Sequence, residues 1–211
     1  MISEQDLILI QKAIKIYDKM VGKTYLLAYS SSKNQPLKVV EIAISEENFW
    51  HLLGCKAHKG NDQKELFKRC LDNENICQLL DYTRKSQDLK KKSEIFNRLF
   101  DFIENAKMLT LCNTDGLPEE SMFQIGAGTV NGIIGYAKIS NVHIPKTTQD
   151  KSVFALRSNA NDRIFLIMSK KTESAKYDVL EYVSSPKYKD EIISKLPEEY
   201  LHRIQEESKS T

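Results

Sequence analysis

The sequence predicts an α+β domain in which N-terminal helices and a β-hairpin pack on a C-terminal antiparallel sheet, with a helical insertion and a helical C-terminal tail. Two observations predict this class. Up to residue 107 most apolar residues recur at helical spacing, interrupted by one hairpin pattern. From Met108 onward the chain consists mainly of short segments with a strand-like composition. Because no repeat or linker divides the 211 residues, we expect one domain over residues 1–183 and a helical extension over residues 184–211.

The composition is that of an ordinary globular protein and argues against several classes. Hydrophobic residues make up 41% of the chain, and 31 basic against 29 acidic residues give a net charge of +2. This balance does not indicate a polyanion-binding protein, although it allows a local basic patch. The aliphatic runs are much shorter than the roughly 20 residues of a membrane span. The N-terminus also lacks the basic region followed by a hydrophobic stretch that marks a secretory signal. We therefore expect a cytoplasmic protein that has no membrane partner.

The first predicted elements are a helix and a hairpin. The helix covers residues 3–21, with Ser3 as its cap and Gly22 after its end. Residues 24–30 and 37–44 then read as two strands joined by a polar turn. The second strand alternates in polarity, which is typical of a strand with two different faces.

A short helix with one histidine should follow the hairpin. Residues 49–55 read Phe-Trp-His-Leu-Leu-Gly-Cys, with Ser45 placed to cap the helix and Gly54 suited to the left-handed turn that ends it. His51 is the single imidazole within this apolar set. It is interpreted either as a core histidine bonded to a backbone carbonyl or as a functional group.

Residues 61–107 are expected to form the helical insertion, in two or three pieces. They hold the densest basic stretch of the chain, which comprises Arg84, Lys85, Lys90, Lys91, Lys92 and Arg98. A solvated helix face and a surface that follows phosphates are both compatible with this stretch.

The C-terminal half should supply the strands of the sheet. The candidate strands are residues 108–112, 121–125, 132–139, 153–156, 163–169 and 176–183. The glycine-rich residues 126–132 lack the Lys-Ser/Thr and the following helix of a phosphate-binding loop, so we expect tight turning between strands there. After the strand 132–139, an ordered loop should carry His143, Pro145, Lys146, Thr147 and Thr148.

The cysteines and histidines offer one metal-site alternative. The four cysteines form no CxxC pair, and we expect them to be small buried residues in a reducing compartment. His51, Cys55 and His58 would share one face of an unbroken helix and could bind zinc. Since Gly54 is expected to break that helix, we predict no metal and no cofactor.

Three short motifs together resemble a family of phage-associated nucleases. Residues 49–54 match the pattern FxHLxG, Pro145-Lys146-Thr147 matches P-x-S/T, and the strand 163–169 with the lysines that follow it resembles an IxxK strand. Lys23-Thr24-Tyr25 also fits the family's opening. These residues resemble family 4 of the phage Barnase–EndoU–colicin–RelE-like (BECR) nucleases, over roughly residues 1–180. The chain departs from the family in Cys55, where an aliphatic residue is usual, and in the helical insertion.

The resemblance implies metal-independent RNA cleavage by a phage or mobile-element protein with a toxin-like role, in which the ribose 2′-hydroxyl attacks the adjacent phosphate. Such a reaction needs a base, an acid and donors to the phosphorane. His51 is the first candidate for proton transfer and His143 the second. Lys138 or Lys146 would supply positive charge, and Thr147 or Thr148 a hydroxyl donor.

The partners implied by the resemblance are an RNA substrate and an antitoxin or inhibitor protein. The alternative function is a catalytically inactive BECR-fold module that binds a protein or nucleic acid, with His51 only packing.

Overall fold

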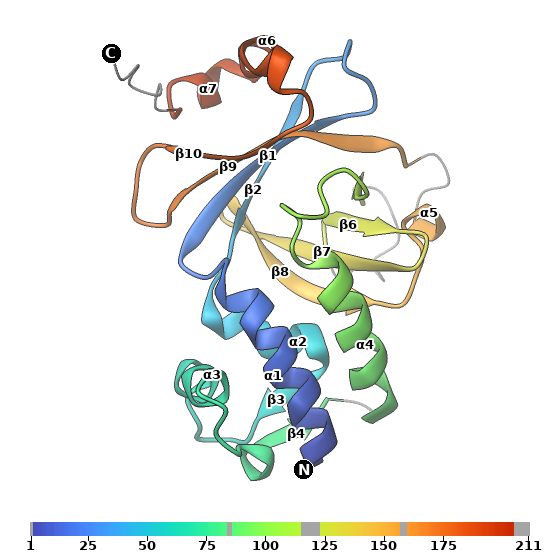
Figure 1. The fold of residues 1–211 in the computed structure, drawn as a ribbon, viewed down its shortest axis with the longest axis vertical. Helices are drawn as coiled ribbons and strands as arrows, with labels where there is room; N and C mark the ends of the chain where they lie inside the picture. Colours follow the sequence, from blue (N-terminus) through green and yellow to red (C-terminus); the bar gives the residue numbers. More distant parts are fainter. Residues whose placement is uncertain (1, 84–85, 115–122, 157–159, 205–211) are drawn as a thin grey trace.

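The computed structural model describes residues 2–83, 86–114, 123–156 and 160–204, and it confirms the α+β class (Figure 1). Its helices are α1 (Glu4–Asp18), α2 (Phe49–Leu53), α3 (Gln63–Leu71), α4 (Ser86–Leu99), α5 (Val153–Leu156), α6 (Lys189–Ser194) and α7 (Glu198–Leu201), with 3₁₀ turns η1 (Glu46–Asn48), η2 (Cys77–Leu79) and η3 (Pro186–Tyr188). Its strands are β1 (Lys23–Ser30), β2 (Lys38–Ala43), β3 (Cys55–Ala57), β4 (Leu80–Tyr82), β5 (Thr110–Asn113), β6 (Ile125–Thr129), β7 (Gly132–Ile139), β8 (Val142–Gln149), β9 (Asp162–Lys171) and β10 (Val179–Val183). None of the described helices has the length and apolar character needed to cross a membrane.

Seven strands pair in a closed ring, in the order β1-β2-β8-β7-β6-β5-β9 and back to β1, and β10 is added to β9. Two joints in this ring are short. The parallel β2–β8 joint has one register pair, Ile42 with His143, and the β5–β9 joint has two. The other pairings are antiparallel ladders of four or more residue pairs. The ring therefore consists of a hairpin half (β1, β2, β9, β10) and a meander half (β5 to β8).

Helices α1, α2 and α4 lie below the sheet in Figure 1 and bury the largest core against it. The α1 helix starts at Ser3, whose side chain accepts a hydrogen bond from the backbone N–H of Asp6. At the far end of α1, the buried Tyr17 ring lies 5.2 Å from that of Phe49 and 4.8 Å from that of Phe100, centroid to centroid. This aromatic cluster ties α2 and the residues after α4 to α1, which fixes the helices that carry the candidate site.

The C-terminal segment covers the outer face of the hairpin half. Ile192 of α6 and Leu196 pack in a second core with Tyr177 and residues of β1 and β9. Beyond α7, the guanidinium of Arg203 donates two hydrogen bonds to the carboxylate of Glu41, at 2.6 and 3.0 Å, and the Tyr177 hydroxyl donates to the same carboxylate. We call Glu41, Tyr177 and Arg203 the clasp. The predicted helical tail is thus present as three short turns, and residues 205–211 lie outside the described part.

Three local expectations were wrong. The insertion 61–107 is not wholly helical, because β4 within it pairs with β3 before it. Residues 153–156 form α5 rather than a strand, and the predicted loop after β7 is the strand β8. The tight turn expected within residues 126–132 is confirmed at residues 130–131, and residues 126–129 before it lie in strand β6. Its Gly128 is needed because a Cβ there would lie 2.5 Å from the carbonyl oxygen of Gly132.

The helix over residues 3–21 and the strands over residues 24–30, 37–44, 132–139 and 163–169 are confirmed to within three residues at each end. Residues 121 and 122, which begin the predicted strand 121–125, lie outside the described part of the chain, and so do Arg84 and Lys85 of the basic stretch.

Candidate active site

Helix α2 holds His51 rigidly and leaves its ring accessible. Its other four side chains, Phe49, Trp50, Leu52 and Leu53, are fully buried, whereas His51 is exposed. The Trp50 indole donates to the carbonyl oxygen of Gln63 at 3.1 Å. Four buried side chains among five residues fix the orientation of this short helix. The exposed His51 is therefore not a core histidine, which was the first of the two interpretations of its sequence context.

Gly54 ends α2 as the sequence predicts. Its φ of 74° is left-handed, and its N–H donates to the carbonyl oxygen of His51 at 3.1 Å. The expected cap at the other end differs, because the Ser45 side chain makes no cap hydrogen bond and donates instead to the Asn48 side chain.

Lys92 of α4 reaches the end of α2. A Cβ placed on Gly54 would lie 3.4 Å from Cδ and 3.5 Å from Nζ of Lys92, so the lysine side chain packs against the bare backbone of the glycine. The same Cβ position lies 3.5 Å from the Thr83 hydroxyl, which donates to the Gly54 carbonyl oxygen at 2.9 Å. The half-buried Lys92 side chain therefore lies beside Gly54, which is three residues after His51, although α4 itself is distant in sequence.

A β-bulge places Lys146 on the same side as α2. Tyr136 pairs with Pro145, and Gly135 pairs with Thr147, which leaves Lys146 as the extra residue of β8. A bulge redirects side chains that regular alternation would send to the other face. Helix α2 packs against β8, and the exposed Lys146 ammonium acts electrostatically on His51.

The electrostatics of His51 follow from these neighbours. Partial burial is the largest cause that lowers the pKa of His51 below its usual value near 6.5, and the positive charges of Lys146 and Lys92 lower it further. At neutral pH the imidazole is therefore mainly neutral and able to accept a proton. Among the described residues, no carboxylate lies within ion-pair distance of Lys146.

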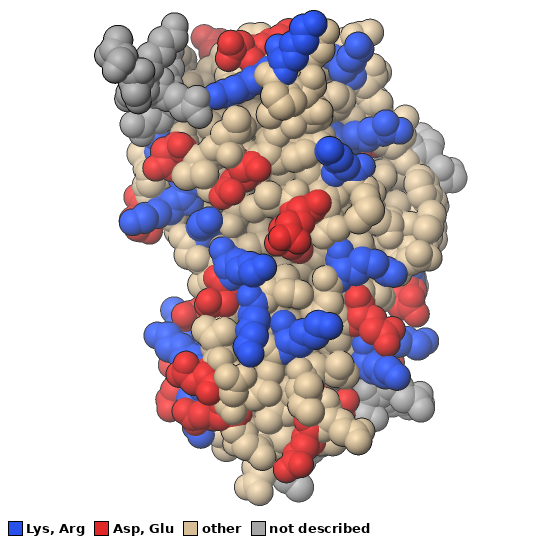
Figure 2. All heavy atoms as spheres, viewed as in Figure 1, with Lys and Arg blue, Asp and Glu red and all other residues tan. Residues whose placement is uncertain are grey.

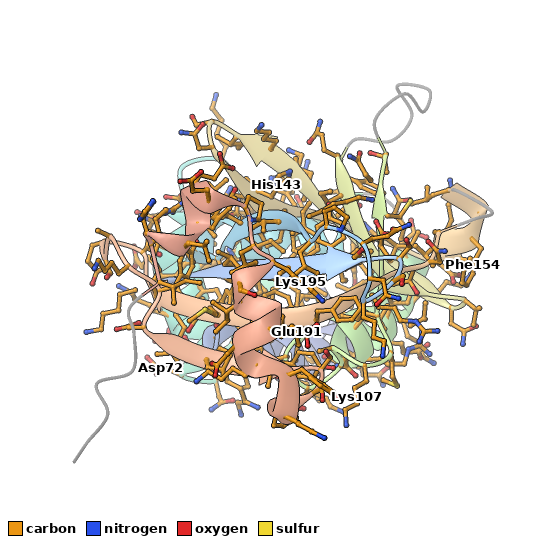
Figure 3. The ribbon with its side chains drawn as sticks, turned by 90° about the horizontal axis from the view of Figure 1, so that it is seen from above. Asp72, Lys107, His143, Phe154, Glu191 and Lys195 are labelled. Atoms are coloured by element: carbon orange, nitrogen blue, oxygen red, sulfur yellow. The ribbon has the colours of Figure 1, made fainter. Side chains whose placement is uncertain are left out.

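The other predicted residues lie elsewhere on β7 and β8. Lys138 and His143 pair across the two strands, at the joint where His143 also meets Ile42 of β2. Figure 3 labels His143 beside β8. His143 is three residues from Lys146, which corresponds to about 10 Å along a strand. Lys138 is exposed, but it is not one of the charges that shift the pKa of His51.

Thr147 and Thr148 point to opposite faces of β8. The Thr147 methyl lies 2.9 Å from a Cβ placed on Gly135, on the side where Phe123 packs. Thr148 pairs with Ile134 of the main core and is 1% exposed, and its hydroxyl has no hydrogen-bond partner in the described structure. The structure thus brings together His51, Lys146 and Lys92, which we call the site cluster.

Sequence reasoning missed Lys92. Its only signal was membership in the Lys90–Lys92 run, which favoured a solvated helix face over a surface that follows phosphates. The chain position of Gly54 gave no sign that a lysine 38 residues later packs on it.

The alternative zinc site is not formed by the described residues. They contain no group of three or more His, Cys, Asp or Glu side chains arranged to hold a metal ion. Cys55 is buried, which raises the pKa of its thiol to about 12, and His58 lies 3.0 Å from the Asp81 carboxylate.

A protein-family model matches residues 9–185 and is described as phage-Barnase-EndoU-ColicinE5/D-RelE like nuclease4, PBECR4. No curated protein and no solved structure matches the chain. The matched residues include α2, α4 and β8, which carry the site cluster, and they end before α6 and Arg203. This finding confirms the resemblance carried by the FxHLxG and P-x-S/T motifs. Because the match spans most of the sequence, the chain belongs to the PBECR4 family of phage Barnase–EndoU–colicin–RelE-like nucleases.

Proposed function

We propose that this protein is a metal-independent endoribonuclease that cleaves RNA by attack of the 2′-hydroxyl on the adjacent phosphate. One observation carries the proposal. The accessible His51 imidazole, whose pKa is lowered, lies near the ammonium groups of Lys146 and Lys92, which come from distant parts of the chain. A neutral imidazole can take a proton from a sugar hydroxyl, and cations stabilise the charge that develops on phosphorus-bound oxygens.

In this mechanism His51 accepts the 2′-hydroxyl proton as the O2′–P bond forms. The Lys146 and Lys92 ammonium groups face the non-bridging oxygens of the phosphorane. The P–O5′ bond then breaks, and the O5′ atom receives a proton. The products are a 2′,3′-cyclic phosphate and a 5′-hydroxyl end. The threonine hydroxyls receive no role, because Thr148 is buried and Thr147 packs toward Phe123.

The second proton-transfer group in the proposal is His143, which protonates O5′. Its place three residues from Lys146 on the same strand supports this assignment. Lys138, its cross-strand neighbour, would then help to hold the RNA backbone.

The test is cleavage of a mixed panel of RNAs in the presence of EDTA. We expect cleavage by the natural protein, with cyclic-phosphate ends, and a loss of about 10³-fold in kcat/KM for His51→Ala, in the range for removal of a general base. His143→Ala should also lower kcat/KM, because O5′ would lose its proton donor. Intact RNA across the panel at micromolar protein would overturn the proposal and favour an inactive binding module.

The toxin-like role, the antitoxin or inhibitor partner and the cytoplasmic location stay predictions. Growth arrest on expression of the natural protein, relieved by His51→Ala, would support the first of these. Equal growth with both proteins would contradict it.

A further inference from the structure

The end of helix α2 is held by Thr83, the residue that follows β4. The Thr83 N–H donates to the Gly54 carbonyl oxygen at 2.8 Å, and the Thr83 hydroxyl donates to the same oxygen at 2.9 Å. Gly54 in turn donates its own N–H to the His51 carbonyl oxygen at 3.1 Å. A carbonyl oxygen has two lone pairs, so Thr83 satisfies that of Gly54 completely. The last turn of α2 is therefore joined directly to Thr83.

Thr83 is itself fixed by the strand before it. Strand β4 pairs with β3, which follows Gly54 directly, and both strands lie below α2 in Figure 1. The Tyr82 hydroxyl donates to the Asp6 carboxylate in the first turn of α1 and accepts from the Ser3 N–H at 3.3 Å. Thr83 is thus connected to α1 as well as to α2, and its side chain has a defined position.

The Thr83 hydroxyl oxygen and the Lys92 ammonium both lie close to the bare side of Gly54. A Cβ placed on this glycine would lie 3.5 Å from each of the two atoms, so they are separated by no more than twice that distance. The hydroxyl has a single hydrogen, which it donates to the Gly54 carbonyl oxygen. It can therefore present only lone pairs to other neighbours, and lone pairs attract an ammonium group, which has three donors and no acceptor.

Lys92 differs from its neighbours in the Lys90–Lys92 run. Lys90 and Lys91 are exposed, and Lys91 forms an ion pair with Asp150 at 3.6 Å. Lys92 is half-buried against Gly54. Keeping a long lysine side chain in one rotamer costs conformational entropy, and a fixed acceptor beside the ammonium offsets part of that cost.

The charge distribution makes the placement of single ammonium groups important. Figure 2 shows Lys and Arg side chains interspersed with Asp and Glu over the face on which α1 lies. Where the two signs are mixed, the fields of distant charges largely cancel, and a phosphate is attracted mainly by cations that are close to it. Lys92 can therefore act on a phosphorane only if its ammonium is held near the reacting atoms.

We propose that Thr83 is a positioning residue of the site cluster, whose hydroxyl holds the Lys92 ammonium beside Gly54, where it acts on His51. This inference rests on the proposed ribonuclease function and adds a residue that the mechanism above does not use. Thr83 takes no step of its own in the reaction. It acts through Lys92, which faces the non-bridging oxygens of the phosphorane.

The experiment compares two substitutions of Thr83 by NMR titration of the His51 imidazole, without RNA. Thr83→Val keeps the branched shape and the N–H bond but removes the hydroxyl, whereas Thr83→Ser retains a hydroxyl. The Lys92 charge lowers the pKa of His51, so this pKa should rise toward its usual value when Thr83→Val releases the ammonium. Thr83→Ser should show the same pKa as the natural protein. Because Thr83 is exposed, both variants keep the core intact.

A double variant shows whether Thr83 acts through Lys92. In the Lys92→Met background, Thr83→Val should leave the pKa of His51 unchanged, because the charge that Thr83 positions is already absent. In RNA cleavage, Thr83→Val alone should lower kcat about tenfold and change KM little, since the ammonium acts on charge that develops in the transition state. The titration needs no cleavage, so its result is separate from the outcome of the ribonuclease test.

Thr114→Val is the chemical control. The Thr114 hydroxyl also donates to a backbone carbonyl oxygen, that of Phe123, beyond β5. This variant should melt at a lower temperature but leave the pKa of His51 as it is. An unchanged pKa in Thr83→Val, an equal rise in Thr114→Val, or the same rise in the Lys92→Met background would each overturn the proposal.

Discussion

Two charged clusters in this molecule are built in opposite ways. In the clasp, the Glu41 carboxylate is only 7% exposed and receives hydrogen bonds from both Arg203 and Tyr177. The negative Glu41 carboxylate is thus paired with the positive Arg203 guanidinium, and the clasp joins the C-terminal segment to β2. Because burying a charge without a partner is costly, such a cluster holds the fold together and has little left to offer a ligand.

The site cluster brings charges of one sign together. Two ammonium groups approach one imidazole, and each of them lowers the pKa of His51. The arrangement gains nothing for folding from the repulsion between like charges, but it is ready to receive an anion. The difference between the clusters indicates that charge balance separates a structural cluster from a binding cluster in this fold.

The largest effect is expected from removing both cations of the site cluster. Lys92→Met combined with Lys146→Met should lower kcat/KM for RNA cleavage by about 10³-fold, since loss of one transition-state donor costs roughly 10²–10³ in buried sites and these sites are partly open. Lys146→Met alone should leave the melting temperature equal or raise it, because no carboxylate in the described part of the chain lies within ion-pair distance of Lys146. Lys90→Met, on the exposed side of α4, serves as the control with unchanged activity. A strongly destabilised Lys146→Met variant would show that Lys146 is structural.

The next largest effect is expected in the clasp, where a substitution should lower stability without changing catalysis. Arg203→Met leaves Glu41 buried without its cation, which should cost about 3 kcal/mol and lower the melting temperature by about 6–12 °C. Cleavage at 20 °C should be unchanged. Adding Glu41→Gln should recover part of the lost stability, because the uncompensated charge is removed. If the double variant is less stable than Arg203→Met, the clasp acts mainly through packing rather than charge.

A smaller effect is expected at the glycine that ends α2. Gly54→Ala forces an alanine into a left-handed conformation, at about 1 kcal/mol, with a Cβ in contact with Lys92. Gly22→Ala is a matched control, because its φ of 76° is nearly the same and no atom lies within 4 Å of the added Cβ. Both variants should melt about 2–4 °C lower, but only Gly54→Ala should alter cleavage. Equal cleavage by the two variants would show that Lys92 takes no part in the site cluster.

The smallest effect concerns pH. Positive charge lowers the pKa of His51, so Lys146→Met should raise that pKa toward its usual value. The base is active when neutral, so the acid limb of the kcat/KM profile should move to higher pH. NMR titration of the imidazole provides the same quantity without RNA. A shift to lower pH, or none, would show that Lys146 does not act on this ring.

Sequence periodicity was sufficient for the long elements. Helix α1 repeats its apolar residues every three or four positions, and β7 was placed at its full extent. Periodicity failed where elements are short or polar: β3 and β4 have three residues each, α5 has four, and β8 contains a proline and a lysine that obscure its strand pattern. Such segments take their conformation from their partners in the fold.

The candidate site was predictable only in part, for a related reason. His51 was identified because a local pattern surrounds it, and Lys146 because it follows Pro145. Lys92 depends on a contact between two helices that no local pattern encodes. The same holds for the bulge that redirects Lys146, since a register shift is a property of two strands rather than one.

The short parallel joint between β2 and β8 has a consequence for the geometry of the site cluster. His51 follows the hairpin half, whereas Lys146 belongs to the meander half, and in the described part of the chain a single register pair, Ile42 with His143, joins β2 to β8. The distance between the His51 imidazole and the Lys146 ammonium is therefore set by the packing of the apolar face of α2 against β8. We expect substitutions in this buried interface, which lies away from the bound RNA, to change the turnover rate of cleavage before they lower the stability of the fold.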